Sequence, residues 1–409
     1  MCAAETSCPK VAAAACRPLK VAWFSFFPVE WMPDSPESVR RLPRGHAATW
    51  QQVLAAELEP RPDFKLHVIV LRKEFERDLD FDLRGISFHL RRTVGGLRAP
   101  SFFWHDTWII RRALRQIQPD VVHAWGTEHG AALVAARCHY PYVLTMQGLL
   151  SWYATQTRLS RYHRFAAKLE RWSVPRAPVV TTESRFGIQY LERHFPGPRY
   201  VQVEHAPKRL FHELRRHPQT QPAQFLFVGA FGQIKGGDLL LQALDQVKAE
   251  FPFEMLIVSG RDEAFLQRVR PTVSAALWDR VRFEASLTSE QVAEKMASAT
   301  MMIFPTRADT SPNSVKEAVV AGLPVVASAV GGIVDYVFPE KNGLLVPSGQ
   351  LAPLADAIRA AVRHPLFGQG QVDAATLAAV REYLSPRLMG ERFMQIYREL
   401  AVPRGTGKS

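Results

Sequence analysis

The 409-residue chain is 47% hydrophobic and 22% charged, which is the composition of a globular protein with material for two domains. No apolar run approaches the roughly 18–20 residues of a membrane-spanning helix, and the four cysteines form neither zinc-type pairs nor a disulfide framework. Residues 1–205 carry 28 Lys and Arg against 19 Asp and Glu, an excess that favours an anionic partner unless it is only an Arg-rich compositional habit.

Strand-like runs alternate with helix-like segments through residues 20–210, after a tail, residues 1–19, that we expect to be disordered. The runs are short and apolar on both faces, as buried parallel strands are. They are Val21–Phe27, Leu66–Leu71, Ile86–Leu90, Val121–Trp125, Tyr142–Met146, Val179–Thr182 and Tyr200–Val203. The alternation predicts a Rossmann-like, doubly wound α/β domain.

A polar, proline-containing stretch, residues 211–222, is expected to be a linker to a second Rossmann-like domain at 223–385. The strands expected there are Phe225–Val228, Met255–Val258, Val281–Phe283, Met301–Pro305, Pro324–Ala327 and Leu344–Val346. Residues 386–402 have helical spacing and are expected to pack back across the cleft, ahead of a tail at 403–409. Because ligands bind at the carboxyl ends of such strands, two facing sheets would bring two substrates into one central cleft.

Residues 301–347 carry the most specific pattern in the chain. Ser311 is expected to cap a helix whose first residue is Pro312, and Gly322 to end it. Free backbone N–H groups at the start of this helix suit a diphosphate. Two acids bracket that start, Asp309 and Glu317, and they suit neutral hydroxyls of a sugar and a ribose better than a phosphate. A glycine pair, residues 331–332, would let backbone come close to a ligand.

These residues resemble the donor-binding signature of family 4 glycosyltransferases. The matching residues are Asp309, Glu317-Ala318, Gly322-Leu323-Pro324-Val325-Val326-Ala327, Gly331-Gly332 and Asn342-Gly343-Leu344-Leu345-Val346. A second match is Gly229 followed by Lys235-Gly236, where the lysine fits a phosphate-binding role. The family more often has Glu where Asp309 stands, and Arg where Ala230 stands; Arg307 or Arg261 are candidates to compensate for that arginine.

The resemblance implies a GT-B fold, retention of anomeric configuration, and a set of site residues. Catalytic roles fall on Asp309, Glu317 and Lys235. The donor site would comprise Gly229, Lys235, Gly260, Arg261, Asp309, Ser311, Asn313, Ser314, Val315, Glu317, Gly331 and Gly332. The donor would be a nucleotide diphosphate sugar, UDP- or GDP-linked, and no cofactor or metal is expected.

The first half is expected to bind the acceptor. Candidate residues are Gly45, His46, His123, Glu128, Gln147 and Gly148, in loops that follow strands or open a helix. Trp125 and Gln147 stand where many family members have a histidine. Each candidate has a plainer interpretation: His46 as a capping or solvated residue, His123 as a satisfied strand-end histidine, and Glu128 as a structural loop acid.

Two charged segments of the first half remain. Asp78-Leu79-Asp80 and Asp82 resemble a metal-binding motif but are expected to lie in a solvated loop. Five cations recur at helical spacing beside an aromatic stripe: Arg158, Arg161, Arg164, Lys168 and Arg171. Such a stripe suits an anionic membrane surface, or else it is the solvated face of a docked helix.

The favoured function is hexosyl transfer to a polysaccharide precursor or lipid-linked acceptor, by a cytoplasmic enzyme peripheral to the membrane. No nucleic-acid-binding module is recognisable. Two alternatives stay open: a non-catalytic, nucleotide-sugar-binding partner subunit, and a GT-B-fold sugar-nucleotide epimerase.

Overall fold

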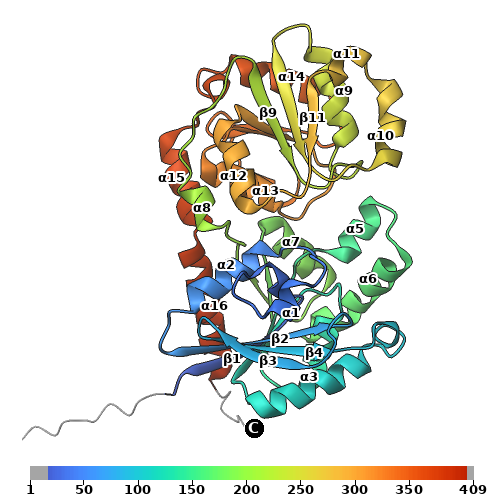
Figure 1. The fold of residues 1–409 in the computed structure, drawn as a ribbon, viewed down its shortest axis with the longest axis vertical. Coiled ribbons are helices and arrows are strands. Elements are labelled where there is room, and N and C mark those ends of the chain that lie inside the picture. Colours follow the sequence, from blue (N-terminus) through green and yellow to red (C-terminus); the bar gives the residue numbers. More distant parts are fainter. Residues whose placement is uncertain (1–16, 403–409) are drawn as a thin grey trace, which may run out of the picture.

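The computed structural model describes residues 17–402, which form two α/β units, each built around one sheet (Figure 1). The first sheet has the order β3-β4-β2-β1-β5-β6-β7-β8, and the second has the order β11-β10-β9-β12-β13-β14. The strands of the first are β1 Leu19–Phe24, β2 Phe64–Arg72, β3 Leu79–Leu83, β4 Ile86–Arg92, β5 Val121–Trp125, β6 Tyr142–Thr145, β7 Val179–Thr182 and β8 Arg199–Gln202. Those of the second are β9 Ala223–Val228, β10 Phe253–Val258, β11 Val281–Glu284, β12 Met301–Phe304, β13 Val325–Ser328 and β14 Gly343–Val346.

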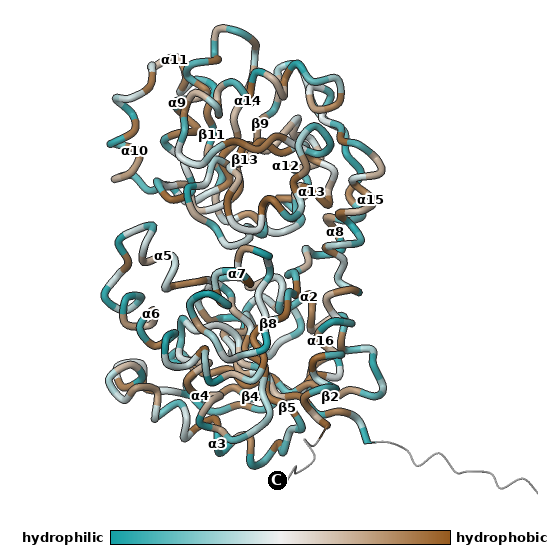
Figure 2. Tube along the Cα trace, turned by 180° about the vertical axis from the view of Figure 1, so that it is seen from behind, coloured by the Kyte–Doolittle hydropathy of each residue, from teal (hydrophilic) through white to brown (hydrophobic). Residues whose placement is uncertain are grey.

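Helices cover both faces of each sheet. The longer helices of the first unit are α2 Thr49–Leu58, α3 Trp104–Ile117, α4 Ala131–Cys138, α5 Leu150–Gln156, α6 Arg161–Ser173 and α7 Arg185–His194, with the short α1 Glu37–Arg40 before them. The second unit has α9 Gly237–Val247, α10 Glu263–Val269, α11 Ala275–Trp278, α12 Ser289–Ser298, α13 Asn313–Ala321, α14 Leu351–Arg363 and α15 Ala374–Tyr383. Figure 2 shows the most hydrophobic chain along the central strands, as expected for sheets buried between helices.

Side chains of one strand alternate between two cores of the first unit. Val21 and Trp23 of β1 lie in the cluster under α2, whereas Ala22 and Phe24 lie in the cluster under α3 and α4. The fold class predicted from the apolar runs, two Rossmann-like parallel sheets, is therefore confirmed. The expected tails, residues 1–19 and 403–409, fall outside the described residues except for 17–19, of which Leu19 begins β1.

The prediction of a solvated loop at Asp78–Asp82 is wrong, because residues 79–83 form the edge strand β3, antiparallel to β4. Leu79, Phe81 and Leu83 pack on the core while the aspartates between them face outward, which is the period of a strand. Arg84 and Gly85 form the turn, both with positive φ, as a type I′ hairpin requires. Charged residues in the outward positions masked this alternation.

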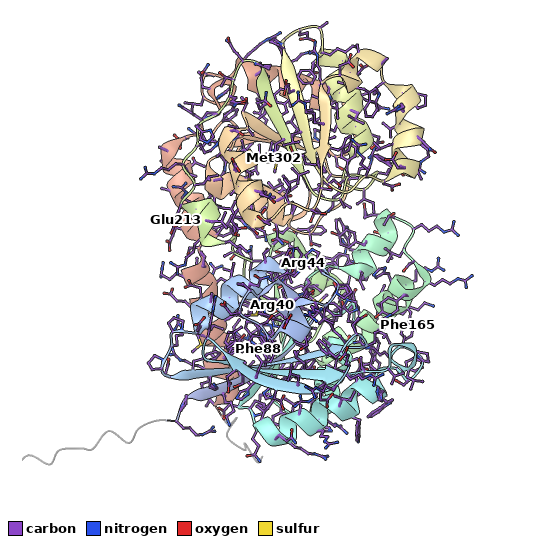
Figure 3. The ribbon with its side chains drawn as sticks, viewed as in Figure 1. Arg40, Arg44, Phe88, Phe165, Glu213 and Met302 are labelled. Carbon is purple, nitrogen blue, oxygen red and sulfur yellow. The ribbon has the colours of Figure 1, made fainter. Side chains whose placement is uncertain are left out.

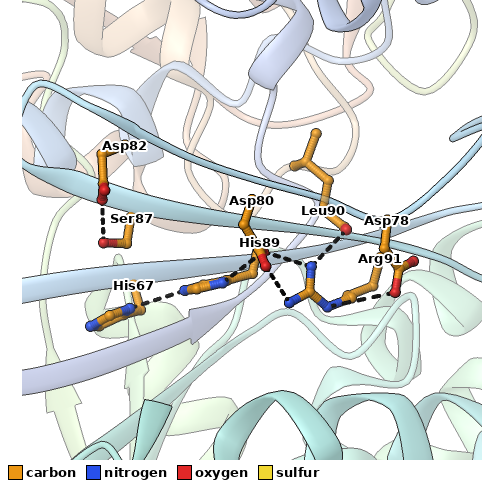
Figure 4. Close-up of polar contacts among 8 residues, drawn as sticks. All are labelled: His67, Asp78, Asp80, Asp82, Ser87, His89, Leu90 and Arg91. Carbon is orange, nitrogen blue, oxygen red and sulfur yellow. Dashed lines mark hydrogen bonds and ion pairs between the residues drawn. The ribbon is translucent and has the colours of Figure 1, made fainter. Parts of the chain in front are cut away.

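The hairpin also accounts for the aspartates that resemble a metal motif (Figure 4). Asp80 accepts two hydrogen bonds from the Arg91 guanidinium, at 2.7 and 3.1 Å, and pairs with His89 at 2.9 Å. Asp78 lies 3.9 Å from Arg91. Across residues 17–402, no group of three or more His, Cys, Asp or Glu side chains is arranged to hold a metal ion.

The two units are joined by packed chain rather than by a free tether. The short helix α8, Arg209–His212, buries Phe211 in the core of the second unit, and Arg216 donates hydrogen bonds to the carbonyls of Gly322 and Gly370. The last helix, α16, Pro386–Ala401, returns to the first unit and lies against α2 (Figure 1). Its Tyr397 hydroxyl accepts a hydrogen bond from Trp23 of β1 at 3.0 Å. No helix within residues 17–402 is long and apolar enough to cross a bilayer.

Candidate functional site

Helix α13 follows strand β12 and an eight-residue loop, and its Lys316 contacts Glu183 of the first unit. The N-cap is Pro312 and not Ser311, so the predicted start was one residue early. Val315, predicted to bind the donor, is fully buried in the core, and its N–H already bonds to the carbonyl of Pro312 at 3.2 Å. Asn313 and Ser314 stay half-buried at the helix start. Gly322 ends the helix with φ +76°, as predicted.

Lys235 and Asp309 are 74 positions apart in the sequence and form an ion pair beside this helix. Asp309 is 6% exposed, and its second oxygen accepts the Ser311 N–H at 3.2 Å. Burial raises the pKa of Asp309, and the Lys235 ammonium acts against that rise. The proposed phosphate-binding cation is thus held in place by the proposed sugar-binding acid.

Glu317 lies one turn into α13 and is half-buried. Burial raises its pKa to about 7, although Lys208 and Lys316 lower it. A carboxyl group with such a pKa is poised to change protonation near neutrality and is well suited to hydrogen-bond a hydroxyl.

A pocket of about 720 Å³ lies between the second unit and α5 of the first. Lys235, Gly260 and Arg261, all predicted donor residues, line it from the second unit together with Ala230. Tyr153 and Thr157 line it from the α5 side. Arg307, one of the two candidates for a second phosphate cation, is instead paired with Asp238 through two hydrogen bonds of 2.6 and 2.8 Å.

The predicted glycines play local structural roles. Gly229 adopts φ +145°, a conformation that side chains disfavour, at the end of β9. A Cβ at Gly331 would lie 1.9 Å from the Asp309 carbonyl oxygen, and one at Gly332 would lie 2.7 Å from Cβ of Ser184. Gly331 and Gly332 therefore allow two segments of this chain to pack closely at the edge of the site. The sequence had suggested instead that they let the backbone come close to a ligand.

A buried ionic cluster that the sequence did not reveal joins the units next to α13. Lys316, fully buried, donates to Glu183 at 2.6 Å, and His205 lies 3.1 Å from the same carboxylate. Burial alone would raise the pKa of Glu183, but Lys316 and His205 outweigh it and hold the pKa at about 2. Beside the cluster, Asp335 accepts the Arg185 backbone N–H at 2.9 Å. In the sequence, the one sign of this cluster was Lys316, a charged residue inside the apolar run of α13.

On the first unit, the loops after β5 and β6 bring together three of the predicted acceptor residues. A Cβ at Gly126 would lie 2.3 Å from Glu128 and 3.0 Å from Gln147, and one at Gly148 would lie 3.2 Å from Glu128. Glu128 accepts the Thr127 N–H at 2.9 Å. Burial raises its pKa to about 7, and repulsion from Glu170 adds to that rise.

The other three predicted acceptor residues have local structural contacts. His123 is fully buried, with ring nitrogens 2.6 Å from Tyr397 Oη and 2.6 Å from Thr145 Oγ1, so both nitrogens have protein partners and the ring joins α16 to the sheet. Gly45 and His46 lie in a loop before α2 and not on the helix start. Gly45 donates to Glu30 at 3.0 Å, and His46 accepts the Ala48 N–H at 3.1 Å, so both stabilise the loop.

Several buried polar side-chain atoms of the first unit have no hydrogen-bond partner among residues 17–402. They include the ring N–H groups of Trp50 and Trp125, the Gln51 amide nitrogen and Nε2 of His205. The His205 ring stacks on Trp50 at 5.4 Å and lies 6.0 Å from Trp125. Trp125 and Gln147 also line a small pocket with Ser25 and Phe26.

Comparison with known proteins covers both units. The family model "Glycosyltransferase Family 4" matches residues 52–204, and "Glycosyl transferases group 1" matches residues 222–364. The 2-deoxystreptamine N-acetyl-D-glucosaminyltransferase of Streptomyces fradiae is 30% identical over 72% of this chain and 74% of its own. The 2-deoxystreptamine glucosyltransferase of Streptomyces kanamyceticus is 28% identical over 62% of this chain and 69% of its own.

Solved structures share the fold at low identity. Sucrose-phosphate synthase from Thermosynechococcus elongatus superposes with a TM-score of 0.76 at 19% identity, covering 94% of this chain and 99% of that one. Anabaena Alr3699/HepE in complex with UDP-glucose gives a TM-score of 0.67 at 14% identity, covering 93% and 100%.

Proposed function

This chain belongs to the family 4 glycosyltransferases with the GT-B fold, and on that premise we propose that it transfers a hexose from a nucleotide diphosphate sugar with retention of configuration. The observation that carries the proposal is the ion pair of Lys235 with Asp309 ahead of α13, the helix that also carries Glu317, together with the pocket of about 720 Å³ that Lys235 lines. The UDP-glucose bound by HepE, which has the same fold, supports a nucleotide-sugar donor. The epimerase and the non-catalytic subunit are not favoured.

On the donor side, cationic groups bind the charged part of the donor and acidic groups bind its neutral hydroxyls. Lys235 and the N–H groups at Asn313 and Ser314 hold the diphosphate, since cations and helix N-termini stabilise anions. Glu317 accepts hydrogen bonds from the ribose, and Asp309 from the transferred sugar. As the donor binds, the Lys235 ammonium exchanges part of its contact with Asp309 for the phosphate, which leaves Asp309 free to take a sugar hydroxyl.

The acceptor-side residues position the attacking hydroxyl. Glu128 and Gln147, whose side chains meet at the carboxyl edge of β5 and β6, hold the acceptor over the donor sugar. The leaving phosphate accepts the hydroxyl proton on the same face, and the new glycosidic bond forms as the bond to phosphate breaks. Stabilising the charge that develops on that phosphate is the main catalytic task of Lys235.

The acceptor is proposed to be a polysaccharide precursor or a lipid-linked glycan. The names of the two Streptomyces relatives add an aminocyclitol such as 2-deoxystreptamine to the acceptors worth testing. The enzyme is proposed to act at the cytoplasmic face of a membrane, which it contacts through Arg158, Arg161, Arg164, Lys168 and Arg171. All five side chains are exposed.

The test starts with a thermal-shift screen of UDP- and GDP-sugars, followed by mass spectrometry of reactions with lipid-linked glycans and 2-deoxystreptamine. NMR of the product then assigns the new anomeric centre. Inversion would disprove retention, and failure of every nucleotide sugar to bind would disprove the donor site.

The proposal also includes catalysis without a metal ion, because Lys235 and the start of α13 serve the leaving phosphate. Activity is therefore expected to survive EDTA. If EDTA abolishes transfer and Mn²⁺ restores it, this part of the proposal is wrong.

A further inference from the structure

Apolar side chains are exposed in an unusual concentration on the first unit. Of the ten large hydrophobic side chains exposed within residues 17–402, five come from one stretch of 15 residues: Val94, Leu97, Phe102, Trp104 and Trp108. The two tryptophans lie one turn apart on α3 and are 54% and 62% exposed. Their helix buries its opposite face through Ile109, Ile110 and Leu114, so they are not needed for the core.

The backbone before α3 is strained in a way that holds one aromatic ring outward. Phe102 and Phe103 both have left-handed φ values, +48° and +59°, which bulky residues adopt rarely and at a cost. Phe103 is 1% exposed and packs in the core, while Phe102 beside it is 53% exposed. Strain of this kind persists where the exposed conformation has a use.

Cation–π contacts join these rings to helix α6. The Arg137 guanidinium lies 4.2 Å from the ring centre of Trp104 and 5.9 Å from that of Trp172. Arg176 lies 3.8 Å from the ring centre of Trp172, and Phe102 is 5.7 Å from Phe165, which Figure 3 labels on α6. We define the α3–α6 face as Phe102, Trp104, Trp108, Arg137, Trp172 and Arg176.

The charge around this face has one sign. Residues 94–115 and 158–176 contain ten Lys and Arg but only two acids, Asp106 and Glu170, and both acids are buried. A notch of about 560 Å³ beside Trp108 continues this surface toward β4; Arg92, His105 and Arg112 line it together with Asp78 and Asp80, whose carboxylates pair with Arg91. A partner surface that complements this face is therefore anionic and able to accommodate aromatic rings.

We propose that the α3–α6 face inserts its aromatic rings into the headgroup region of an anionic lipid bilayer. Tryptophan rings favour the boundary between water and hydrocarbon, and arginines beside them bind lipid phosphates. Exposed aromatic area of this size on a protein surface marks an interaction site. The inference rests on the proposed membrane contact of α6, and it moves the anchoring role from the five cations there to the aromatic residues of α3.

Flotation with vesicles tests the proposal on the full-length protein. The protein is expected to float with vesicles of phosphatidylglycerol and phosphatidylethanolamine at low salt, and to bind vesicles of phosphatidylcholine alone weakly. Trp104→Ala/Trp108→Ala should weaken binding to the anionic vesicles by about tenfold or more, because two large apolar side chains leave the interface. The matched control, Val334→Ser/Phe338→Ser, removes two exposed apolar residues of the second unit and should bind as the parent does.

A second measurement separates insertion from simple attraction of charges. Brominated phosphatidylcholine mixed into the anionic vesicles quenches tryptophans that enter the bilayer. Trp104→Phe/Trp108→Phe should still float but lose the part of that quenching that Trp104 and Trp108 contribute, leaving the part due to Trp172. Donor binding should be unchanged in the variants of α3 and α6, since Lys235 and Asp309 lie in the other unit.

Three results would overturn the inference. If Trp104→Ala/Trp108→Ala floats like the parent while Arg158→Glu/Arg161→Glu/Arg164→Glu does not, the α6 cations alone hold the membrane. If the parent ignores anionic vesicles, the proposed membrane contact fails as well, whereas glycosyl transfer to a soluble acceptor would still stand. If light scattering shows a dimer that the double alanine variant dissociates, the face binds a second copy of the chain.

Discussion

At the scale of single residues, burial and neighbouring charges together decide the protonation of the acidic side chains in the site. Lys235 and Asp309 neutralise each other, while Lys208 and Lys316 counter only part of the effect of burial on the pKa of Glu317. The resemblance predicted a donor-side role for all three residues, and that role stays a prediction. It did not predict the direct ion pair of Lys235 with Asp309, which depends on how two loops meet in space.

Replacing Glu317 with Ala should weaken donor binding by about 2–4 kcal/mol, because the ribose hydroxyls lose a charge-assisted acceptor. Calorimetric titration with the nucleotide found in the screen measures the change. Glu263→Ala, on the outer helix α10, is the control and should leave the affinity unchanged. Equal affinities for parent and Glu317→Ala would remove Glu317 from the donor site.

Replacing Glu128 with Gln tests the pKa of about 7 that burial and Glu170 give its carboxyl group. A raised pKa means that the folded protein binds the proton more tightly than the unfolded chain, so Glu128 lowers stability as the pH rises from 4.5 to about 7. The variant should therefore be more stable than the parent above pH 7, and the difference should vanish near pH 4. Melting temperatures of both proteins across this range provide the measurement. A constant difference at every pH would show that Glu128 titrates normally.

At the scale of elements, runs that are apolar on both faces were informative, whereas charged residues and the residue type of a helix cap misled. Buried parallel strands were located to within a few residues because apolar side chains on both faces leave no other interpretation. The strand β3 was missed because Asp80 and Asp82 occupy its outward positions and look like a charged loop. The start of α13 was misplaced by one residue because Ser311 has the side chain of an N-cap, yet Pro312 occupies that position.

Helix α13 is also the element that ties the donor site to the first unit, through Lys316 and Glu183. Lys316→Met should lower stability by roughly 3–5 kcal/mol, because it leaves Glu183 buried with a reduced set of partners. Lys316→Met/Glu183→Leu should recover part of this loss, since neither member of the ion pair is then left unpaired and only His205 loses a partner. The control Arg185→Ala removes an exposed partner of Asp335 and should cost little.

Denaturation in urea at neutral pH measures these differences. The parent should also lose stability as the pH falls from 4.5 toward 2, because the pKa of Glu183 is lowered in the folded state and its contribution disappears on protonation. In the double variant that part of the acid sensitivity should be absent. If the single Lys316→Met variant is as stable as the parent, the cluster does not join the units.

At the scale of the whole molecule, the two units are not independent along the chain. The sequence predicted two sheets and a final helix that returns across the cleft, since apolar positions recur through residues 386–402. It could not predict which core that helix completes. Met389, Phe393 and Tyr397 enter the core of the first unit, where Tyr397 bonds to both Trp23 and His123. The first unit is therefore complete only when the last part of the chain has docked.

Because of this arrangement, we expect Phe393→Ala to lower the stability of the first unit without changing the affinity for the donor nucleotide. The Phe393 ring is fully buried, 5.1 Å from His123 and 5.9 Å from Trp125, so its loss should destabilise the first unit by about 3–5 kcal/mol. Affinity for the nucleotide should stay unchanged at temperatures where the protein is folded, because Lys235 and the α13 helix belong to the other unit. Calorimetry should show an early transition that nucleotide does not shift, followed by one that it does.

Gln395→Ala, on the exposed face of α16, should melt like the parent. A single transition that nucleotide shifts as a whole in Phe393→Ala would mean that the ionic cluster, and not α16, decides how the two units unfold.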